Sequence, residues 1–166
     1  MQTDSNPYAA PRTPLAEQAT RLRITAVLVG AAIANGIYFG VMSVLGLGYF
    51  WLLVLQGVPT DQLYAHAYAS TPYIAFAHVV GFACMVPGGY WSARLSPNAG
   101  KAAAQWAAVV LSALAALDYL SPYEFPVPLW SRLASLLGPF PAFWFGAVLW
   151  SRDVEAPAQS GSGDVC

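Results

Sequence analysis

Charged residues are scarce in this 166-residue sequence: only 9% of them are Asp, Glu, Lys or Arg, while 57% are hydrophobic. A typical soluble domain carries roughly 25% charged residues, because polar side chains must cover a surface that faces water. So few charges exclude a water-soluble globule. The class that remains is an integral membrane protein, with membrane lipids as its surroundings.

Basic residues are also few, since 7 Lys and Arg stand against 8 Asp and Glu and the formal net charge is −1. Nucleic-acid-binding proteins need Lys and Arg gathered on one face to neutralise phosphates. The composition therefore predicts no nucleic-acid partner. Cysteine is rarer still, with Cys84 inside an apolar run and Cys166 at the last position, so we expect no disulfide.

Charge-free stretches mark the expected membrane spans, because an ion at the centre of a bilayer is costly. One span needs about 20 mostly apolar residues. The stretches predict an all-α fold, an integral membrane bundle of four transmembrane helices that forms one domain over residues 21–151. The spans are expected near 22–47, 71–94, 101–120 and 128–150.

The first apolar run is too long for one crossing. A helix over residues 22–55 would measure about 51 Å, against a hydrocarbon core of about 30 Å. We therefore expect the helix to end or bend around residues 46–48, where two glycines lie, with residues 49–56 either extending it or lying at the outer interface. A short amphipathic helix is expected after Pro59, with Thr60 as a candidate N-cap.

The basic residues predict the orientation, because Lys and Arg concentrate on the cytosolic side of membrane proteins. All but Arg132 flank the predicted spans on one side. The spans are therefore expected to run N-in and C-in, with residues 1–20 and 152–166 as disordered cytosolic tails. The basic residues on the shared side are Arg12, Arg21, Arg23, Arg94, Lys101 and Arg152.

Two rows of small residues predict where helices pack, since small side chains let two helix backbones approach closely in a membrane. We expect the two rows to face each other within one chain, and a contact between two copies in a homo-oligomer is the alternative. The second span carries the row Ala77, Gly81, Cys84, Gly88 and Ser92. The first span carries the row Ala32, Gly36, Gly40 and Ser43.

The second span ends in Gly88-Gly89-Tyr90-Trp91-Ser92-Ala93-Arg94, and Pro97 follows soon after. This segment resembles a family of small, uncharacterised bacterial inner-membrane proteins with four spans, in which a Gly-Gly-aromatic-x-x-Ala-Arg segment closes a helix before a proline. The start of the fourth span, Pro128-Leu129-Trp130, is similar to theirs. The resemblance implies a multi-pass protein of the bacterial inner (cytoplasmic) membrane and carries over no catalytic residue.

A few polar residues within or beside the spans are candidate contacts for a partner or ligand. Asn35 is expected to form an interhelical hydrogen bond, with a ligand contact as the alternative. His78 is expected to be a hydrogen-bonded packing residue. Arg132, the lone basic residue on the outer side, is expected to pair with Glu124 or Asp118.

The fourth span contains Gly138-Pro139-Phe140-Pro141 near its middle. Prolines remove backbone donors and free carbonyls that must find other partners in hydrocarbon. A broken helix at mid-membrane is typical of transport sites, although most proline kinks are structural.

No nucleophile, phosphate-loop or metal-ligand pattern is present in the sequence. We therefore expect a non-enzymatic accessory or interaction protein, without cofactor or metal, whose partner is a second copy or another membrane protein. The first alternative is a transporter-like protein for a small molecule or a lipid, suggested by Asn35, the proline break and an outer collar of tyrosines. The second is a membrane redox protein that uses His66 and His78.

Overall fold

A computed structural model describes residues 23–120 and 127–160, without the side chains of residues 155–160. Within these ranges every regular element is a helix, and no strand occurs. Four helical segments are long and apolar enough to cross a membrane: 24–55, 71–95, 97–118 and 129–154. This confirms the prediction of an all-helical fold with four candidate spans.

Helix α2 runs without interruption over Ile24–Leu55, so residues 49–56 extend it almost completely. The expected end or bend around residues 46–48 is wrong. Both glycines there lie inside the helix, since a helix in hydrocarbon keeps its backbone groups paired even where glycine weakens its local preference. The chain turns only after Gln56, at Gly57 with a φ of 84°, a conformation that favours glycine.

The connection to the next span contains the short helix that the sequence predicted, in two parts. The 3-10 helix η1 covers Thr60–Gln62 and helix α3 covers Leu63–Ala69. Thr60 is not the N-cap, because Pro59 occupies that position and no side chain caps the turn. Pro59 has a β-region backbone that lets the helix begin one residue earlier than a threonine cap would.

Helix α4 covers Thr71–Leu95 and begins with a side-chain cap, in which Ser70 Oγ accepts a hydrogen bond from the Tyr73 backbone N–H at 3.4 Å. Pro87 lies inside this helix without ending it. The 3-10 helix η2 (Pro97–Ala99) and helix α5 (Gly100–Asp118) follow.

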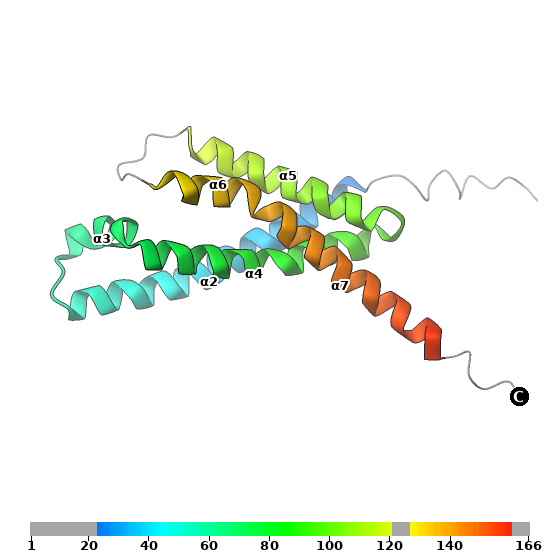
Figure 1. Cartoon of the computed structure of the whole chain (residues 1–166), viewed down its shortest axis with the longest axis horizontal. Helices are drawn as coiled ribbons and strands as arrows, with labels where there is room; N and C mark the ends of the chain where they lie inside the picture. Colours follow the sequence, from blue (N-terminus) through cyan, green and yellow to red (C-terminus); the bar gives the residue numbers. More distant parts are fainter. Residues whose placement is uncertain (1–22, 121–126, 161–166) are drawn as a thin grey trace, which may run out of the picture.

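The fourth segment is broken into α6 (Leu129–Leu137) and α7 (Pro139–Ser160), with Gly138 between them. Figure 1 shows the chain changing direction where α6 meets α7. Helix α7 continues through residues 152–160, which the sequence assigned to a disordered tail. The predicted tail over residues 1–20 lies outside the described residues.

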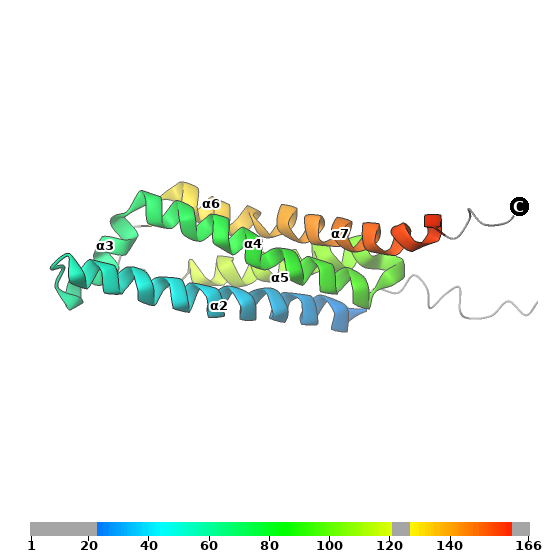
Figure 2. The same cartoon turned by 90° about the horizontal axis from the view of Figure 1, so that it is seen from below.

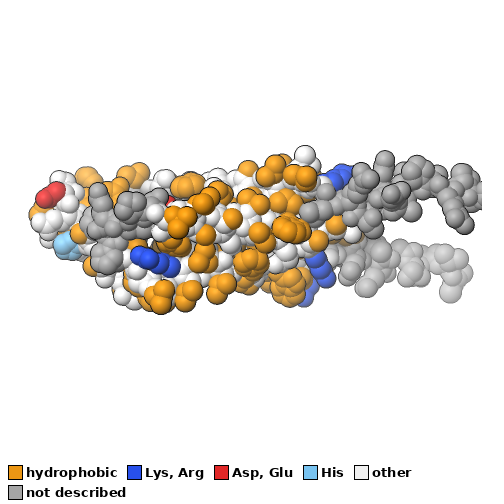
Figure 3. Space-filling model, turned by 90° about the horizontal axis from the view of Figure 1, so that it is seen from above, with side chains coloured by type: hydrophobic (Ala, Val, Ile, Leu, Met, Phe, Trp, Pro, Cys, Tyr) orange, Lys and Arg blue, Asp and Glu red, His pale blue; other side chains and the backbone are white. Residues whose placement is uncertain are grey.

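The four long segments run side by side along the long axis, and successive segments run in opposite directions (Figures 1 and 2). Helix α2 begins and α7 ends at the same end, which also holds the η2 connection. We call this end the basic end, because it carries Arg23, Arg94, Lys101 and Arg152; the opposite end is the α3 end. Hydrophobic side chains cover most of the face seen in Figure 3, and charged ones lie toward its two ends.

Close helix contacts gather toward the basic end, where the core consists mainly of alanine and glycine. A methyl group on Gly88 of α4 would come within 2.6 Å of the Gly30 carbonyl oxygen of α2. On its other side α4 meets α7, where Gly89 lies against the backbone of Phe143 and Gly146 lies against the backbone of Val86. Small residues therefore hold α4 against both neighbours.

The row predicted on the first span does not face α4. Ala32, Gly36, Gly40 and Ser43 are all exposed, and an added methyl group on Gly36 or Gly40 would meet nothing within 4 Å. Helix α2 instead contacts α4 through Gly30 and Ala34. A shift of two residues turns a helix by about 200°, so the predicted row lies on nearly the opposite side of α2. The row on α4 was placed correctly, since Gly81, Cys84, Gly88 and Ser92 are buried and Ala77 is half-buried.

Candidate functional site

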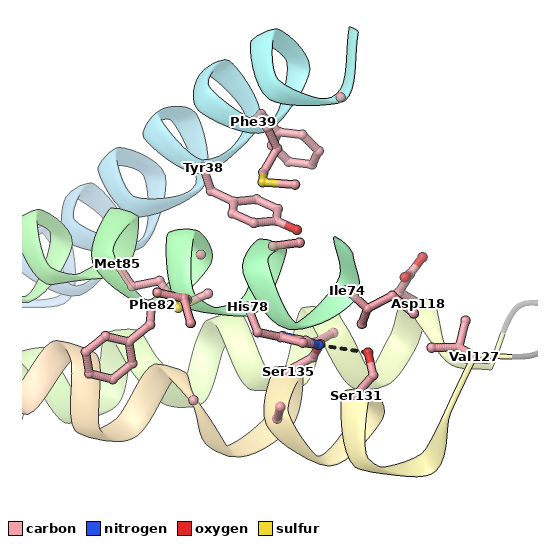
Figure 4. Close-up of a pocket in the computed structure, with 18 of the residues that line it drawn as sticks. Tyr38, Phe39, Ile74, His78, Phe82, Met85, Asp118, Val127, Ser131 and Ser135 are labelled. Carbon is pink, nitrogen blue, oxygen red and sulfur yellow. Dashed lines mark hydrogen bonds between the residues drawn. The ribbon is translucent and has the colours of Figure 1, made fainter. Parts of the chain in front are cut away.

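A cavity of about 1520 Å³ opens between the helices in the half of the bundle toward the α3 end. Its walls come from α2, α3, α4, α5, α6 and the first turn of α7, and Figure 4 shows part of it. The cavity begins where the close packing ends: beyond Ala34, only Leu53 of α2 is buried. Larger side chains such as Tyr38 replace the small residues there and hold the helices apart; the ring of Tyr38 lies over Gly81.

The lining is mostly apolar and aromatic. Tyr49 of α2 stacks on Tyr73 of α4 with ring centroids 4.2 Å apart and planes 13° from parallel. Phe50 of α2 meets Tyr64 of α3 edge to face, with centroids 4.9 Å apart. These pairs tie α2 to the neighbouring helices beyond the polar part of the cavity. They belong to the tyrosine collar that the sequence predicted on this side.

A histidine and a serine lie together in the cavity wall. His78 Nε2 of α4 and Ser131 Oγ of α6 form a hydrogen bond of 2.8 Å, and both side chains are labelled in Figure 4. The Trp130 ring lies 5.5 Å from the His78 ring, edge to face. His78 is thus hydrogen-bonded, as expected, and its partner comes from a helix 53 residues away in sequence.

Three other polar side chains of the cavity have no hydrogen-bond partner among the described residues. Asn35 and Tyr38 on α2 and Ser135 on α6 line the cavity, and none of these three side chains forms a hydrogen bond in the described part of the chain. The interhelical bond expected for Asn35 is therefore not found. The reason is that the helices opposite it have already separated, so its amide meets the cavity instead of a neighbour.

Formal charge is almost absent from the cavity. Asp118, at the end of α5, is the one ionisable carboxylate in the described lining, and neither Lys nor Arg occurs in it. Arg132 lies outside the lining, with its guanidinium 5.6 Å from the centre of the Tyr119 ring. Glu124, one of the partners expected for Arg132, lies outside the described residues.

The break between α6 and α7 is bridged by side chains of α5. Ser112 Oγ donates to the Leu136 carbonyl at 2.8 Å, and Gln105 Nε2 donates to the Phe140 carbonyl at 3.2 Å. Pro139 and Pro141 lack the backbone donors that an unbroken helix would supply at this point. Polar side chains of α5 thus supply hydrogen bonds at the break, which lies at the deep edge of the cavity.

The two histidines have separate environments. His66 is exposed on α3, where its Nδ1 lies 3.2 Å from the Gln62 carbonyl oxygen, while His78 bonds to Ser131. The described residues contain no group of three or more His, Cys, Asp or Glu side chains close enough to hold a metal ion. Cys84 is buried in the helix contact and does not line the cavity.

Comparison with protein-family models, with curated proteins and with solved structures gives no match for this chain. The site must therefore be interpreted from its own geometry. Sequence reasoning selected Asn35 and His78 because polar residues stand out in apolar runs. It missed Tyr38, Ser131 and Ser135, and the available signal was that Ser131 and Ser135 lie one helical turn apart and so share one face of their helix.

Proposed function

We propose that the protein is a non-enzymatic, membrane-embedded binding protein that holds a lipid-like molecule in the cavity at its α3 end. The observation that carries this proposal is the Asn35 amide, which has no hydrogen-bond partner among the residues that the structure describes and lies on a mostly apolar cavity wall, within a helix long enough to span the membrane. Placing an amide in hydrocarbon without a hydrogen-bond partner costs on the order of several kcal/mol of free energy. A bound molecule with an apolar body and a polar end would contact the apolar wall and also form a hydrogen bond with the Asn35 amide.

The size of the cavity supports the same proposal. Its volume of about 1520 Å³ exceeds the roughly 300–1000 Å³ typical of drug-sized ligand sites. Exposed apolar side chains such as Val79 and Phe82 on α4 are part of the wall, so the cavity is continuous with the lipid-facing surface. A molecule dissolved in the bilayer therefore has a direct route into it.

The proposed setting is a bacterial inner membrane, with both ends of the chain in the cytosol and the cavity in the outer leaflet. The charge asymmetry supports this orientation, because Arg23, Arg94, Lys101 and Arg152 share the basic end. The aromatic pairs at the α3 end support the same orientation, because tyrosine side chains concentrate in the headgroup region of the membrane.

The test fills the cavity and compares two neighbouring alanines of α5. Ala115 lines the cavity, whereas Ala116 is exposed and does not. We expect lipids extracted with the purified protein, measured by mass spectrometry, to include a species that Ala115→Trp removes and Ala116→Trp retains. Identical lipid profiles for both variants and the parent protein would contradict the proposal.

A second candidate role, as an accessory or interaction protein, is favoured by one specific observation. Gly36 and Gly40 on α2 face outward with open space around them, so a second copy of α2 can approach the backbone closely. We propose that this row mediates self-association. Gly40→Leu is expected to lower energy transfer between differently labelled copies, while Gly48→Leu, at an equally open position about 80° away on the helix, serves as control. Equal energy transfer in both variants would argue against a dimer through this row.

A further inference from the structure

Three polar side chains of the cavity lie at successive depths between the middle of the bundle and the α3 end. Asn35 lies about 17 Å along α2 from Ile24, and His78 lies about 10 Å along α4 from Thr71. Tyr38 is one turn beyond Asn35, with its ring over Gly81 of α4. Since α2 and α4 run in opposite directions, Asn35, Tyr38 and His78 follow one another from the middle of the bundle toward the α3 end. All three line the same cavity.

These groups present hydrogen-bond donors. The Asn35 amide has two N–H donors and Tyr38 has one O–H donor. A neutral imidazole and a hydroxyl carry one donor hydrogen each, and the bond between His78 and Ser131 uses only one of them. Whichever group donates, one donor hydrogen remains: the Ser131 hydroxyl in one tautomer, the His78 Nδ1–H in the other. The pair therefore keeps a donor available whatever its tautomer.

Charge excludes an acidic head group at this depth. A phosphate inside the hydrocarbon region needs a counter-ion, and the described lining offers no Lys or Arg. Among the described residues, the hydrogen-bond partner of His78 is the uncharged Ser131 hydroxyl.

We infer that the occupant is an uncharged lipid whose polar end presents carbonyl oxygens to Asn35, Tyr38 and the His78–Ser131 pair. The inference rests on the proposed lipid-binding function and specifies the head group. Two kinds of membrane molecule share this chemistry: a quinone ring on an isoprenoid tail, and the ester carbonyls of a diacylglycerol. Anionic phospholipids do not fit the cavity in the same way. Their phosphate would enter it together with the ester carbonyls, and the described lining offers no Lys or Arg to neutralise the phosphate.

The experiment titrates the full-length protein in detergent micelles with three probes: an isoprenoid quinone, a diacylglycerol and a phosphatidylglycerol, the last two with the same brominated acyl chains. Bromine and quinones both quench tryptophan fluorescence, and Trp130, which lies beside His78, is the reporter in a background where the other five of the 6 tryptophans are replaced by Phe. We expect at least one uncharged probe to bind about tenfold or more tightly than phosphatidylglycerol. The quinone and diacylglycerol arms show which source supplies the carbonyl.

Variants with matched controls assign the contact. Asn35→Leu and Ser131→Ala each remove a donor, or the group that orients one, and are expected to weaken uncharged-lipid binding by about 3- to 10-fold. The controls Asn98→Leu on η2 and Ser151→Ala on α7, both outside the cavity, are expected to leave it unchanged. Ser131→Ala changes little volume, so its melting temperature verifies that the fold is retained.

Three results overturn the inference. Phosphatidylglycerol that binds as tightly as the uncharged probes, and is displaced by Ala115→Trp, removes the head-group assignment but leaves the proposed function standing. Uncharged-lipid binding that is unchanged in both Asn35→Leu and Ser131→Ala removes the contact residues and with them the inference. Binding of none of the three probes removes the proposed function as well.

Discussion

Gly88 of α4 lies directly against Gly30 of α2, so that a methyl group on Gly88 would come within 2.6 Å of the Gly30 carbonyl oxygen and 2.7 Å of the Ala34 methyl carbon. Neither neighbour is a flexible side chain that can move aside. This backbone contact, with the corresponding contacts between α4 and α7 at Gly89 and Gly146, closes one half of the bundle and leaves the other half open.

Gly88→Ala is therefore expected to destabilise the fold by about 1–3 kcal/mol, because the added methyl group overpacks a backbone contact. Unfolding in mixed detergent micelles, followed by circular dichroism, measures the change. The matched control is Gly48→Ala on α2, where an added methyl group meets nothing within 4 Å and which lies outside the row proposed for self-association. Since alanine favours a helix over glycine, the control should be neutral or slightly stabilising. Equal losses in both variants would refute the contact.

Ser92→Ala is expected to stabilise the fold by about 1 kcal/mol. The Ser92 hydroxyl is fully buried and has no hydrogen-bond partner in the described part of the chain, so its removal relieves the cost of an unsatisfied polar group. Ser151→Ala is the comparison, since its hydroxyl donates to the Val148 carbonyl at 2.8 Å. The same unfolding measurement applies, and a clear loss of stability in Ser92→Ala would show that the hydroxyl has a partner.

A separate prediction concerns the two hydrogen bonds from α5 to the break between α6 and α7. Ser112→Ala removes the bond to the Leu136 carbonyl, and Gln105→Leu removes the bond to the Phe140 carbonyl. Each is expected to cost about 0.6–1.7 kcal/mol, the range for hydrogen bonds between membrane helices. Hydrogen exchange of the α6–α7 backbone should increase in both variants. Asn98→Ala, at an exposed position of η2 outside the cavity, is the control, and unchanged exchange at the break would contradict a bridging role.

The proposed orientation is tested by labelling single cysteines in intact cells, in a background where Cys84 is replaced by Ala and Cys166 by Ser. Asn98→Cys on η2 and Gln62→Cys on η1 are both exposed, at opposite ends of the bundle. A membrane-impermeant thiol reagent is expected to label the Gln62 variant in intact cells and the Asn98 variant only after the cells are opened. The reverse pattern would invert the topology.

The sequence was sufficient to predict the number of spans, because hydropathy and missing charge report burial in lipid directly. It was also sufficient for the contact face of α4, where Gly81, Cys84, Gly88 and Ser92 repeat at helical spacing and are all buried. On α2 the same reasoning failed. That helix is apolar all round and carries small residues on two faces, so spacing alone could not show whether Gly30 or Gly36 meets α4.

The cavity could be predicted only in part. Asn35 stands out as an amide in an apolar run, but its lack of a partner depends on how far the helices separate at its level. Ser131 and His78 are 53 residues apart, and their bond depends on the bend at Gly138, whose direction the sequence does not encode locally. Tyrosine and serine are common in membrane helices, so Tyr38 and Ser135 carried no signal of their own.

The crowding of the small-residue contacts at the basic end has a mechanical consequence. In one leaflet lipids surround a tightly closed rod, and in the other they surround helices separated by a gap. Lateral pressure in the leaflet around the closed half changes the helix spacing little, because the helices there are already in contact. Lateral pressure in the leaflet around the cavity acts on the width of the gap. The protein is therefore expected to respond mainly to lipid packing in the leaflet that holds the cavity, between the closed contact of Gly30 with Gly88 and the Tyr49–Tyr73 stack at the far end.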